Sequence, residues 1–269
     1  MNIKSTLQNT KASTFSVFLP NPKQHDFPTP VGTGFFVSPD GWFITAAHVL
    51  TAFSKDSNKP TNMITIEKET LFDVERKMPI PKVVNEVKLV HYDPGNDFAL
   101  LKADIEKNHD QLWLANCKEF PYIKVGTKIL EDGDEVYSFG YPLSTGGLIY
   151  PGPEFVAGTT ELHPRVTSAI VSSIYEKFGM ISHSGVQRTY ILDKALNYGN
   201  SGGPIVSKET GEVNAFCSRF QPVYIPQKHL GEKAIIMIPS LYGVVTNLSF
   251  SMIEEVLVQK GIVQKTSRQ

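Results

Sequence analysis

Short runs of β-branched and aromatic residues, broken every few positions by Gly, Pro, Asn or Asp, constrain the fold of this chain more than any other feature. Runs of this kind at this spacing are typical of an all-β sandwich or barrel. Examples of the segments that we expect to form strands are residues 14–19, 34–37, 42–45, 83–91, 98–102, 135–139, 166–172, 189–192, 204–206 and 243–245. Helical periodicity is sparse, so the sequence predicts an all-β fold.

One segment near the C-terminus departs from this pattern. Within residues 249–257, Met252, Val256 and Leu257 fall on one face of a helix. A serine at the start of the segment would cap its first turn, and Gly261 would end the helix. The sequence therefore predicts a short C-terminal helix.

The 269 residues are enough for one large all-β unit or two small domains. Because no change of composition marks a boundary near the middle, we expect two closely packed halves. The predicted divisions are a loose polar segment at residues 1–13, a first half at 14–125, a second half at 126–248, and a C-terminal helix and tail at 249–269.

Three segments have the composition of loops. Residues 54–62 and 221–233 are polar and are predicted to lie on the surface. Residues 141–164 are rich in Gly and Pro and are predicted to form a long loop. Long loops without regular structure in compact domains are often functional, so we regard residues 141–164 as a candidate control region.

The overall charge and hydropathy exclude several classes of partner. The formal net charge is -1, which gives no electrostatic reason to expect nucleic acid or an anionic membrane as a partner. No stretch approaches the ~18 apolar residues of a membrane span. The chain shows no cofactor motif, and we predict no cofactor.

The cysteines bear on metals and on location. The two cysteines, Cys117 and Cys217, do not have metal-ligand spacing to each other or to a histidine, so we predict no metal site. Two cysteines are few for a disulfide-rich secreted protein, and residues 1–10 have no apolar core of signal-peptide length. From these two features we predict a cytoplasmic protein.

Ser201 lies between glycines in residues 199–204, which read Gly-Asn-Ser-Gly-Gly-Pro. A serine on such a tight turn can expose its hydroxyl beside backbone N–H groups, as a nucleophile with an oxyanion hole requires. The same pattern also fits a plain turn, or the nucleophile elbow of α/β-hydrolases. The elbow needs a helix after the serine and then an acid and a histidine. Here an apolar strand follows, with no aspartate and only His229 downstream, which disfavours that fold.

A histidine and an aspartate precede this serine in suitable contexts. His48 ends a predicted hairpin and follows two small residues, Ala46 and Ala47, which allow close packing around an imidazole. Asp97 stands at the mouth of an apolar strand, whereas Asp93 fits an ordinary turn aspartate. Taken alone, His48 also fits a buried structural histidine, and Asp97 also fits a turn residue.

Together the three contexts resemble the trypsin-like (chymotrypsin-fold) serine peptidases over about residues 30–257. The matching segments are residues 45–48 (Thr-Ala-Ala-His), 97–101 (Asp-Phe-Ala-Leu-Leu) and 199–204, in the order of that family. Residues 193–197 (Asp-Lys-Ala-Leu-Asn) are similar to a segment of the HtrA/Deg group. The resemblance implies two packed six-stranded antiparallel β-barrels with a short C-terminal helix.

The resemblance also implies a role for each site residue. Ser201 would attack the peptide carbonyl, His48 would transfer the proton, and Asp97 would orient the imidazole. The oxyanion hole would be formed at Gly199, Asn200 and Ser201, with the N–H groups of Gly199 and Ser201 as donors. The implied function is a serine endopeptidase that acts on polypeptides through an acyl-enzyme.

The same comparison predicts the walls of the primary substrate pocket, which are Ala195, Leu196 and Tyr198 on one side and Cys217, Ser218 and Arg219 on the other. No acid stands where trypsins keep one to bind Lys or Arg. We therefore expect a small or apolar side chain before the scissile bond, with an acidic side chain facing Arg219 as the alternative.

Two departures from the family change what can be transferred. Secreted relatives are activated when a freed N-terminus pairs with an aspartate before the serine, but the residue here is Asn200, so we predict no such zymogen cleavage. HtrA proteases usually carry a peptide-binding PDZ domain after the protease, and we expect none in this chain.

Other functions stay open from the sequence. One is a regulated or inactive protease-fold module that binds peptides or partners, and another is an esterase that does not cleave peptides. A further hypothesis is that an activating protein partner or the substrate orders residues 198–200, with residues 141–164 and 221–233 as the control regions.

Overall fold

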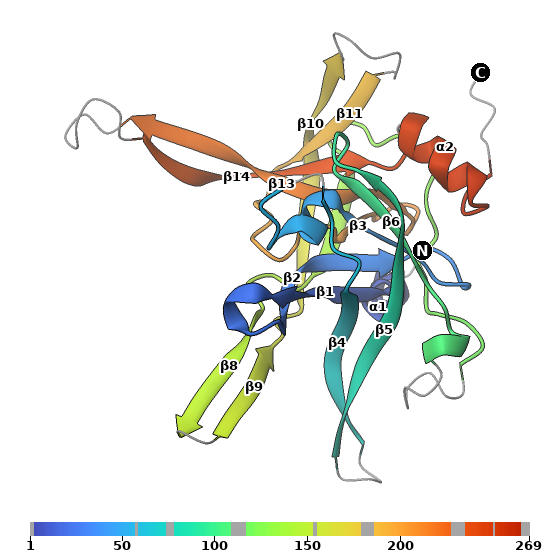
Figure 1. Ribbon diagram of the computed structural model, residues 1–269. Coiled ribbons are helices and arrows are strands. Elements are labelled where there is room, and N and C mark those ends of the chain that lie inside the picture. Colours follow the sequence, from blue (N-terminus) through green and yellow to red (C-terminus); the bar gives the residue numbers. More distant parts are fainter. Residues whose placement is uncertain are drawn as a thin grey trace.

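The computed structural model describes residues 3–56, 59–73, 78–108, 117–152, 155–178, 186–226, 235–249 and 251–264. It contains two closed six-stranded antiparallel barrels and a separate two-stranded sheet (Figure 1). The strand orders are β1-β2-β3-β6-β5-β4 in the first barrel and β10-β11-β14-β13-β12-β7 in the second. The predicted all-β architecture is confirmed.

The first barrel is built around aromatic side chains. Its strands are β1 (Thr14–Asn21), β2 (Phe27–Phe36), β3 (Trp42–Ala46), β4 (Ile64–Asp73), β5 (Met78–Asp93) and β6 (Phe98–Ala103), with short 3-10 helices η1 (Pro22–Gln24), η2 (Ala47–Thr51) and η3 (Glu106–Asn108). The ring of Phe36 stacks on Phe120 with centroids 4.5 Å apart and meets Phe15 and Phe43 edge-on. Such pairs add to the stabilisation from burial. The packed core of this barrel therefore holds the residues at its rim in place.

The second barrel has a smaller core of mainly aliphatic side chains, among them Val136, Ile205 and Val245. Its strands are β7 (Glu135–Gly140), β10 (Arg165–Phe178), β11 (Val186–Leu192), β12 (Pro204–Ser207), β13 (Val213–Pro226) and β14 (Ile235–Asn247). Strands β13 and β14 pair from Ala215↔Asn247 outward to Pro226↔Ile235, so that they extend as an arm beyond the barrel (Figure 1).

The C-terminal helix α2 (Ser251–Gln259) is present, but its buried face differs from the predicted one. Ile253 and Leu257, one turn apart, are buried and join the first core cluster, while Met252 stays 38% exposed. None of the helices in the described part of the chain is long and apolar enough to span a bilayer.

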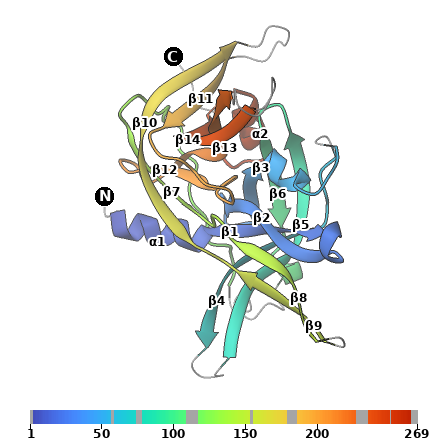
Figure 2. The same cartoon turned by 90° about the vertical axis from the view of Figure 1, so that its left-hand side faces the viewer.

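Within the segment predicted to be loose, Ile3–Ser13 instead form the helix α1 that leads into β1 (Figure 2). Its buried residues are Thr6, Thr10 and Ser13 rather than apolar side chains. The Thr10 hydroxyl hydrogen-bonds the hydroxyl of Tyr137 on β7 at 2.9 Å. This polar contact with the second barrel and the packing of Leu7 against the first core hold the helix, and one apolar contact is too little for hydrophobic periodicity to reveal it.

The long loop predicted at residues 141–164 is instead the hairpin of β8 (Thr145–Gly152) and β9 (Phe155–Glu161), which projects beside the first barrel (Figure 1). A Cβ at Gly158 would lie 2.1 Å from the ring of Phe27 on β2. The glycines that suggested a loop therefore permit close packing against β2, which is another common use of glycine in strands.

The other two predicted loops are only partly described. Strand β13 continues to Pro226, so the first residues of the predicted 221–233 loop are strand. Residues 227–234 lie outside the described residues, as do residues 57 and 58 of the segment 54–62. The rest of 54–62 is irregular, as predicted.

Candidate active site

His48 and Asp97 are joined by three hydrogen bonds at the rim of the first barrel. The ring Nδ1 of His48 lies 2.9 Å from each carboxylate oxygen of Asp97. The backbone N–H of His48 also donates to Asp97 Oδ1 at 3.0 Å, and the N–H of Ala47 donates to the Asp97 carbonyl at 3.0 Å. The carboxylate therefore fixes both the ring and the backbone of the histidine.

The local sequence explains this placement. Strand β3 ends at Ala46 and passes into the turn η2, which carries His48 outward so that its side chain is exposed. Asp97 closes the turn before β6 with φ 55°, a left-handed conformation that costs a non-glycine residue about 1 kcal/mol or more. Asp93, in contrast, accepts from Asn96 N–H at 3.1 Å and is an ordinary turn residue, as predicted.

Ser218 contributes a contact that the sequence did not reveal. Its hydroxyl donates to Asp97 Oδ2 at 2.5 Å, from strand β13 of the second barrel. Hydrogen bonds to an ionised acceptor are short and strong. Ser218 was predicted only as a pocket wall, and no local motif distinguishes it from the other serines of the chain.

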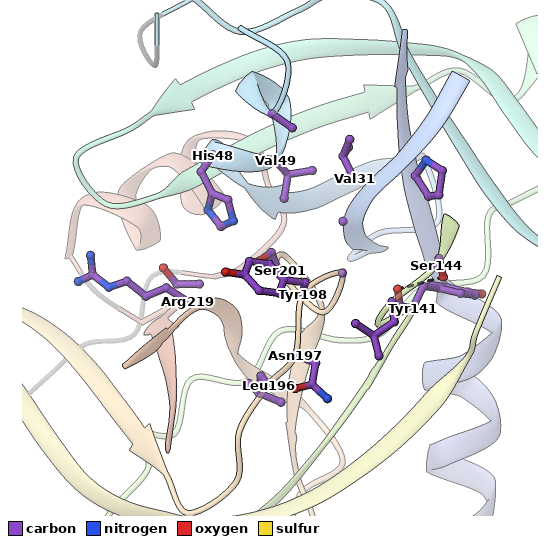
Figure 3. A pocket seen from close by; sticks show the side chains of 16 residues that line it. Val31, His48, Val49, Tyr141, Ser144, Leu196, Asn197, Tyr198, Ser201 and Arg219 are labelled. Atoms are coloured by element: carbon purple, nitrogen blue, oxygen red, sulfur yellow. Dashed lines mark hydrogen bonds between the residues drawn. The ribbon is translucent and has the colours of Figure 1, made fainter. Parts of the chain in front are cut away.

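Ser201 lies across the cavity from His48 (Figure 3). Its carbonyl accepts from Thr33 N–H at 2.8 Å, and Gly202 N–H donates to Cys217 O at 2.6 Å. Gly202 has φ 84°, and a Cβ there would lie 2.2 Å from Thr33 O, so the turn requires glycine at that position. Within the described residues, no hydrogen bond joins the His48 ring to the Ser201 hydroxyl.

The backbone around Ser201 leaves two N–H groups available. The carbonyl of Tyr198 accepts from Leu143 N–H at 2.8 Å. Because a trans peptide is planar, the N–H of Gly199 points away from Leu143. In the part of the chain that the structure describes, neither Gly199 N–H nor Ser201 N–H has a protein acceptor. Asn200 N–H, in contrast, donates to Asn197 O at 3.0 Å and so is not an available donor.

His48, Gly199 and Ser201 line a cavity of about 450 Å³. Of the predicted pocket walls, the structure brings Leu196, Tyr198, Ser218 and Arg219 to this cavity, but not Ala195 or Cys217. Cys217 is instead 1% exposed in the core of the second barrel. The β13–β14 pairing shifts register between Cys217 and Arg219, and here Ser218 and Arg219 line the cavity while Cys217 packs in the core.

Burial sets the chemistry of this cysteine. Complete burial, followed by the charge of Asp97, raises the pKa of the Cys217 thiol well above its usual range. A thiol in that state is a poor nucleophile and a poor metal ligand. Among the residues that the structure describes, no group of three His, Cys, Asp or Glu side chains could hold a metal ion.

A further wall of the cavity, formed by residues other than the predicted pocket walls, was not predicted at all. It includes Val31 from β2 and Val49 from η2, with Tyr141 and Ser144 nearby (Figure 3). Leu143, from the segment after β7, also lines the cavity. These residues carry no motif, because a lone valine or leucine in an apolar sequence gives no sign that it faces a cavity.

The profile of the trypsin-like peptidase domain matches residues 32–215, more than half of the chain and the segment that contains all three candidate residues. This chain belongs to the trypsin-like peptidase family. The resemblance on which the sequence interpretation depended is confirmed.

Relatives place the chain near the HtrA/Deg proteases. A probable periplasmic serine endoprotease DegP-like of Bartonella henselae is 27% identical over 247 residues, which are 88% of this chain and 35% of that protein. A putative protease Do-like 14 of Arabidopsis thaliana is 28% identical over 187 residues, 68% of this chain and 34% of that protein. The chain thus spans about a third of the length of these curated relatives.

A solved structure supports the fold independently. An HtrA-type protease determined with a tripeptide aligns with a TM-score of 0.54 at 17% sequence identity, covering 97% of this chain and 65% of that one. At this identity the match bears on the fold alone.

The predicted cytoplasmic location is wrong. The relatives from Bartonella henselae, Brucella suis and Rickettsia conorii are all named as periplasmic proteases. The low cysteine count misled us, because two barrels with extensive apolar cores need no disulfides for stability, whatever the redox state of the compartment.

Proposed function

We propose that this chain is a serine endopeptidase that hydrolyses peptide bonds of polypeptide substrates with Ser201, His48 and Asp97. The observation that carries the proposal is the pairing of His48 Nδ1 with Asp97 at 2.9 Å on the same cavity that Ser201 lines. The family assignment and the DegP-like relatives support the reaction class.

The hydrogen bonds of His48 support the first half of the proposed reaction. With Nδ1 held by Asp97, the imidazole keeps its proton there and Nε2 is free to act as a base. Ser201 Oγ attacks the carbonyl carbon while Nε2 takes the hydroxyl proton. The carbonyl oxygen becomes an oxyanion, and the N–H groups of Gly199 and Ser201 would receive it. One such donor contributes about 3 kcal/mol to transition-state stabilisation.

The second half regenerates the enzyme. The C–N bond breaks, His48 gives its proton to the departing amine, and an ester on Ser201 remains. Water then attacks this acyl-enzyme while His48 accepts its proton, and the acid product leaves as Ser201 regains a hydrogen. Asp97 stays ionised throughout and stabilises the imidazolium, and the hydroxyl of Ser218 holds the carboxylate in place.

For specificity we propose a small or apolar residue before the scissile bond. Leu196 is buried and packs against Gly243, where a Cβ would lie 3.0 Å from the leucine Cγ. An apolar floor of this kind suits an aliphatic side chain. The exposed Arg219 supports an acidic residue as the second candidate. A peptide library cleaved mainly after Arg or Lys would contradict both.

We also propose that no zymogen cleavage is needed. Asn200 is neutral and 4% exposed, and its side chain lies against Gly140, where a Cβ would be 2.6 Å from Asn200 Oδ1. A freed N-terminal ammonium would find no carboxylate at this position. Intact chain, verified by mass spectrometry before and after assay, is expected to be active.

Two alternatives are distinguished by one assay. Wild-type chain and Ser201→Ala are incubated with an unfolded protein substrate and with an activated ester, and products are identified by mass spectrometry. The proposal predicts peptide-bond cleavage by wild type only. Peptide binding without cleavage would favour an inactive binding module, and ester cleavage alone would favour an esterase. Turnover that requires an added protein would favour the activating partner that the sequence suggested.

A further inference from the structure

One buried hydroxyl of the first barrel reaches the turn that carries Ser201 and has no role so far. We propose that Thr33 is a positioning residue, whose hydroxyl fixes the peptide after Gly199 and thereby the direction of the Gly199 N–H. The inference rests on the proposed function, because it concerns an oxyanion donor of that reaction.

Each of the three polar groups of Thr33 has a hydrogen-bond partner. The residue lies on β2 and is fully buried. Its N–H donates to Ser201 O at 2.8 Å, and its carbonyl accepts from Thr45 Oγ1 at 2.7 Å. Its hydroxyl donates to Gly199 O at 2.5 Å and accepts from Tyr141 N–H at 3.1 Å. Thr33 therefore holds two carbonyls of the Ser201 turn from the opposite barrel.

The bond from the hydroxyl fixes one of the two peptides that meet at Gly199. The peptide after Gly199 is held at both ends, because its carbonyl accepts from Thr33 and its Asn200 N–H donates to Asn197 O at 3.0 Å. The peptide before Gly199 carries the N–H of this glycine, and its carbonyl oxygen lies 2.8 Å from the donor Leu143 N. Because peptides are planar and both are fixed, the direction of the N–H is fixed as well.

Glycine at position 199 makes an outside contact necessary. The two peptides meet there at a φ of 94°. Glycine adopts positive and negative φ values at similar cost, so the residue itself does not select this conformation. A bond from outside the turn selects it, and the Thr33 hydroxyl supplies that bond from a strand of the first barrel.

The same hydroxyl also reaches the segment that holds the peptide before Gly199. It accepts from Tyr141 N–H, and Tyr141 lies two positions before Leu143. Both Tyr141 and Ser201 border the cavity (Figure 3). Hydrogen bonds in a chain polarise one another, so accepting one bond strengthens the bond that the hydroxyl donates. One hydroxyl thus connects the contacts on both sides of Gly199.

Packing alone does not explain a threonine at this position. Valine has nearly the same shape and would fill a fully buried site in a strand without the cost of burying a hydroxyl. The following residues of β2, Phe35 and Phe36, are indeed buried and apolar. A buried hydroxyl is retained where it is hydrogen-bonded, so the bonds to Gly199 and Tyr141 account for it.

The test compares two esters of one acyl peptide that differ in the atom entering the proposed oxyanion hole. One ester has a carbonyl oxygen, and the other is a thionoester with sulfur in its place, which accepts hydrogen bonds weakly. The values of kcat and KM are measured for both esters with wild type, Thr33→Val and Thr33→Ser. Because the ratio of the two kcat/KM values is taken within one variant, losses that affect both esters equally cancel.

Wild type should cleave the oxygen ester with a kcat/KM about 10²-fold or more above that of the thionoester, as expected for losing one oxyanion donor. Thr33→Val should lower this ratio about tenfold or more through kcat, with KM nearly unchanged. Thr33→Ser retains the hydroxyl and should restore most of the ratio. The pH midpoint of kcat/KM should not shift, because no hydrogen bond joins Thr33 to His48 or Asp97 in the described part of the chain.

The matched control is Thr14→Val, since Thr14 is also fully buried and its hydroxyl donates to Thr10 O at 2.7 Å. Its ratio should equal that of wild type. If Thr33→Val does not fold, Thr33→Ala and Thr33→Ser give the same comparison with smaller side chains.

Four results would overturn the positioning role while leaving the proposed peptidase intact. They are a wild-type ratio near one, an unchanged ratio in the variant without the hydroxyl, an equal loss in Thr33→Ser, and an equal loss in Thr14→Val. A wild type that cleaves neither ester nor polypeptide would overturn the proposed function and this inference with it.

Discussion

The pair His48–Asp97 on the first barrel and the Ser201 turn on the second differ in how many of their reactive groups already have hydrogen-bond partners. Asp97 accepts hydrogen bonds from the His48 ring, the His48 backbone and the Ser218 hydroxyl. Around Ser201 the backbone is equally well fixed, but the hydroxyl and the N–H groups of Gly199 and Ser201 have no partner among the described residues. The proposed base is thus oriented in advance, whereas the proposed nucleophile is left open for the substrate.

This difference fits the demands of the reaction. A base works best when its tautomer and orientation are already set. An oxyanion donor works best when it has no hydrogen bond to break as the charge develops. Each barrel also fixes the residue of the other, because Thr33 N–H of the first barrel holds Ser201 O while Ser218 of the second barrel holds Asp97. The site therefore requires both barrels in contact.

The largest expected effect comes from removing the proposed nucleophile. Ser201→Ala should lower kcat by about 10⁶-fold if the three side chains act as a unit. Circular dichroism and the melting temperature should match wild type, since the backbone bonds of the turn do not involve the side chain. Residual peptidase activity within a hundredfold of wild type would show that another group carries the reaction.

Removing the charge of Asp97, the proposed orienting acid, tests the His48–Asp97 pair on the first barrel. Asp97→Asn should lower kcat by about 10⁴-fold, because an amide would favour the wrong imidazole tautomer. The measurement is kcat at pH 7 with protein verified as folded. A loss below tenfold would mean that His48 is positioned without the carboxylate, and the comparison between the two regions would fail.

The open N–H group of Gly199 is tested by Gly199→Ala. The φ of 94° disfavours alanine, and its Cβ would lie 2.4 Å from the carbonyl of Tyr141, so the peptide must move. We expect a loss of about 10²–10³ in kcat, as for removal of one oxyanion donor. Gly133→Ala is the matched control, with φ 89° and no atom within 4 Å of its Cβ. The control should lose about 1 kcal/mol of stability and no activity.

Ser218→Ala should have a smaller effect. It removes a charge-assisted hydrogen bond of a kind worth about 1.5–3 kcal/mol, part of which water can replace, so kcat should fall about tenfold. Ser218→Thr retains the hydroxyl and should restore most of the loss. Equal losses in both variants would indicate a packing effect and not an interaction with Asp97.

The smallest effect is predicted for cysteine modification. Cys117 is exposed, whereas Cys217 is buried with a raised pKa. Iodoacetamide on the folded chain should alkylate Cys117 alone and leave activity unchanged. Peptide mapping that finds Cys217 alkylated in active protein would show that this thiol, next to Ser218, is not buried.

The sequence predicted the residues whose chemistry depends on a local motif. Residues 45–48, 97–101 and 199–204 combine a reactive side chain with small or turn-forming neighbours, so each could be recognised within a few positions. The alternation of apolar runs and turns predicted an all-β fold, and the resemblance to the trypsin-like peptidases implied the two barrels. The strands at residues 64–73 and 213–226 were missed because polar or proline residues interrupt their patterns.

The parts that failed depend on contacts between distant residues. Ser218 reaches Asp97 across 121 positions, and Thr10 reaches Tyr137 across 127. Nothing in the neighbourhood of either residue encodes such a contact. The glycines of residues 141–164 suggested a loop, yet Gly158 packs against the side chain of Phe27, more than a hundred positions away. Local patterns can therefore identify reactive groups but not the contacts that position them.

The central claim is that Ser201 is a nucleophile activated by His48 in one cavity, and covalent labelling tests it most directly. Wild-type chain is treated with a fluorophosphonate, and the adduct is quantified and located by peptide mapping, alongside His48→Ala. We predict one phosphonate per chain on Ser201, formed at least a thousandfold more slowly in His48→Ala. Labelling at another residue, or an equal rate in the two proteins, would contradict the account.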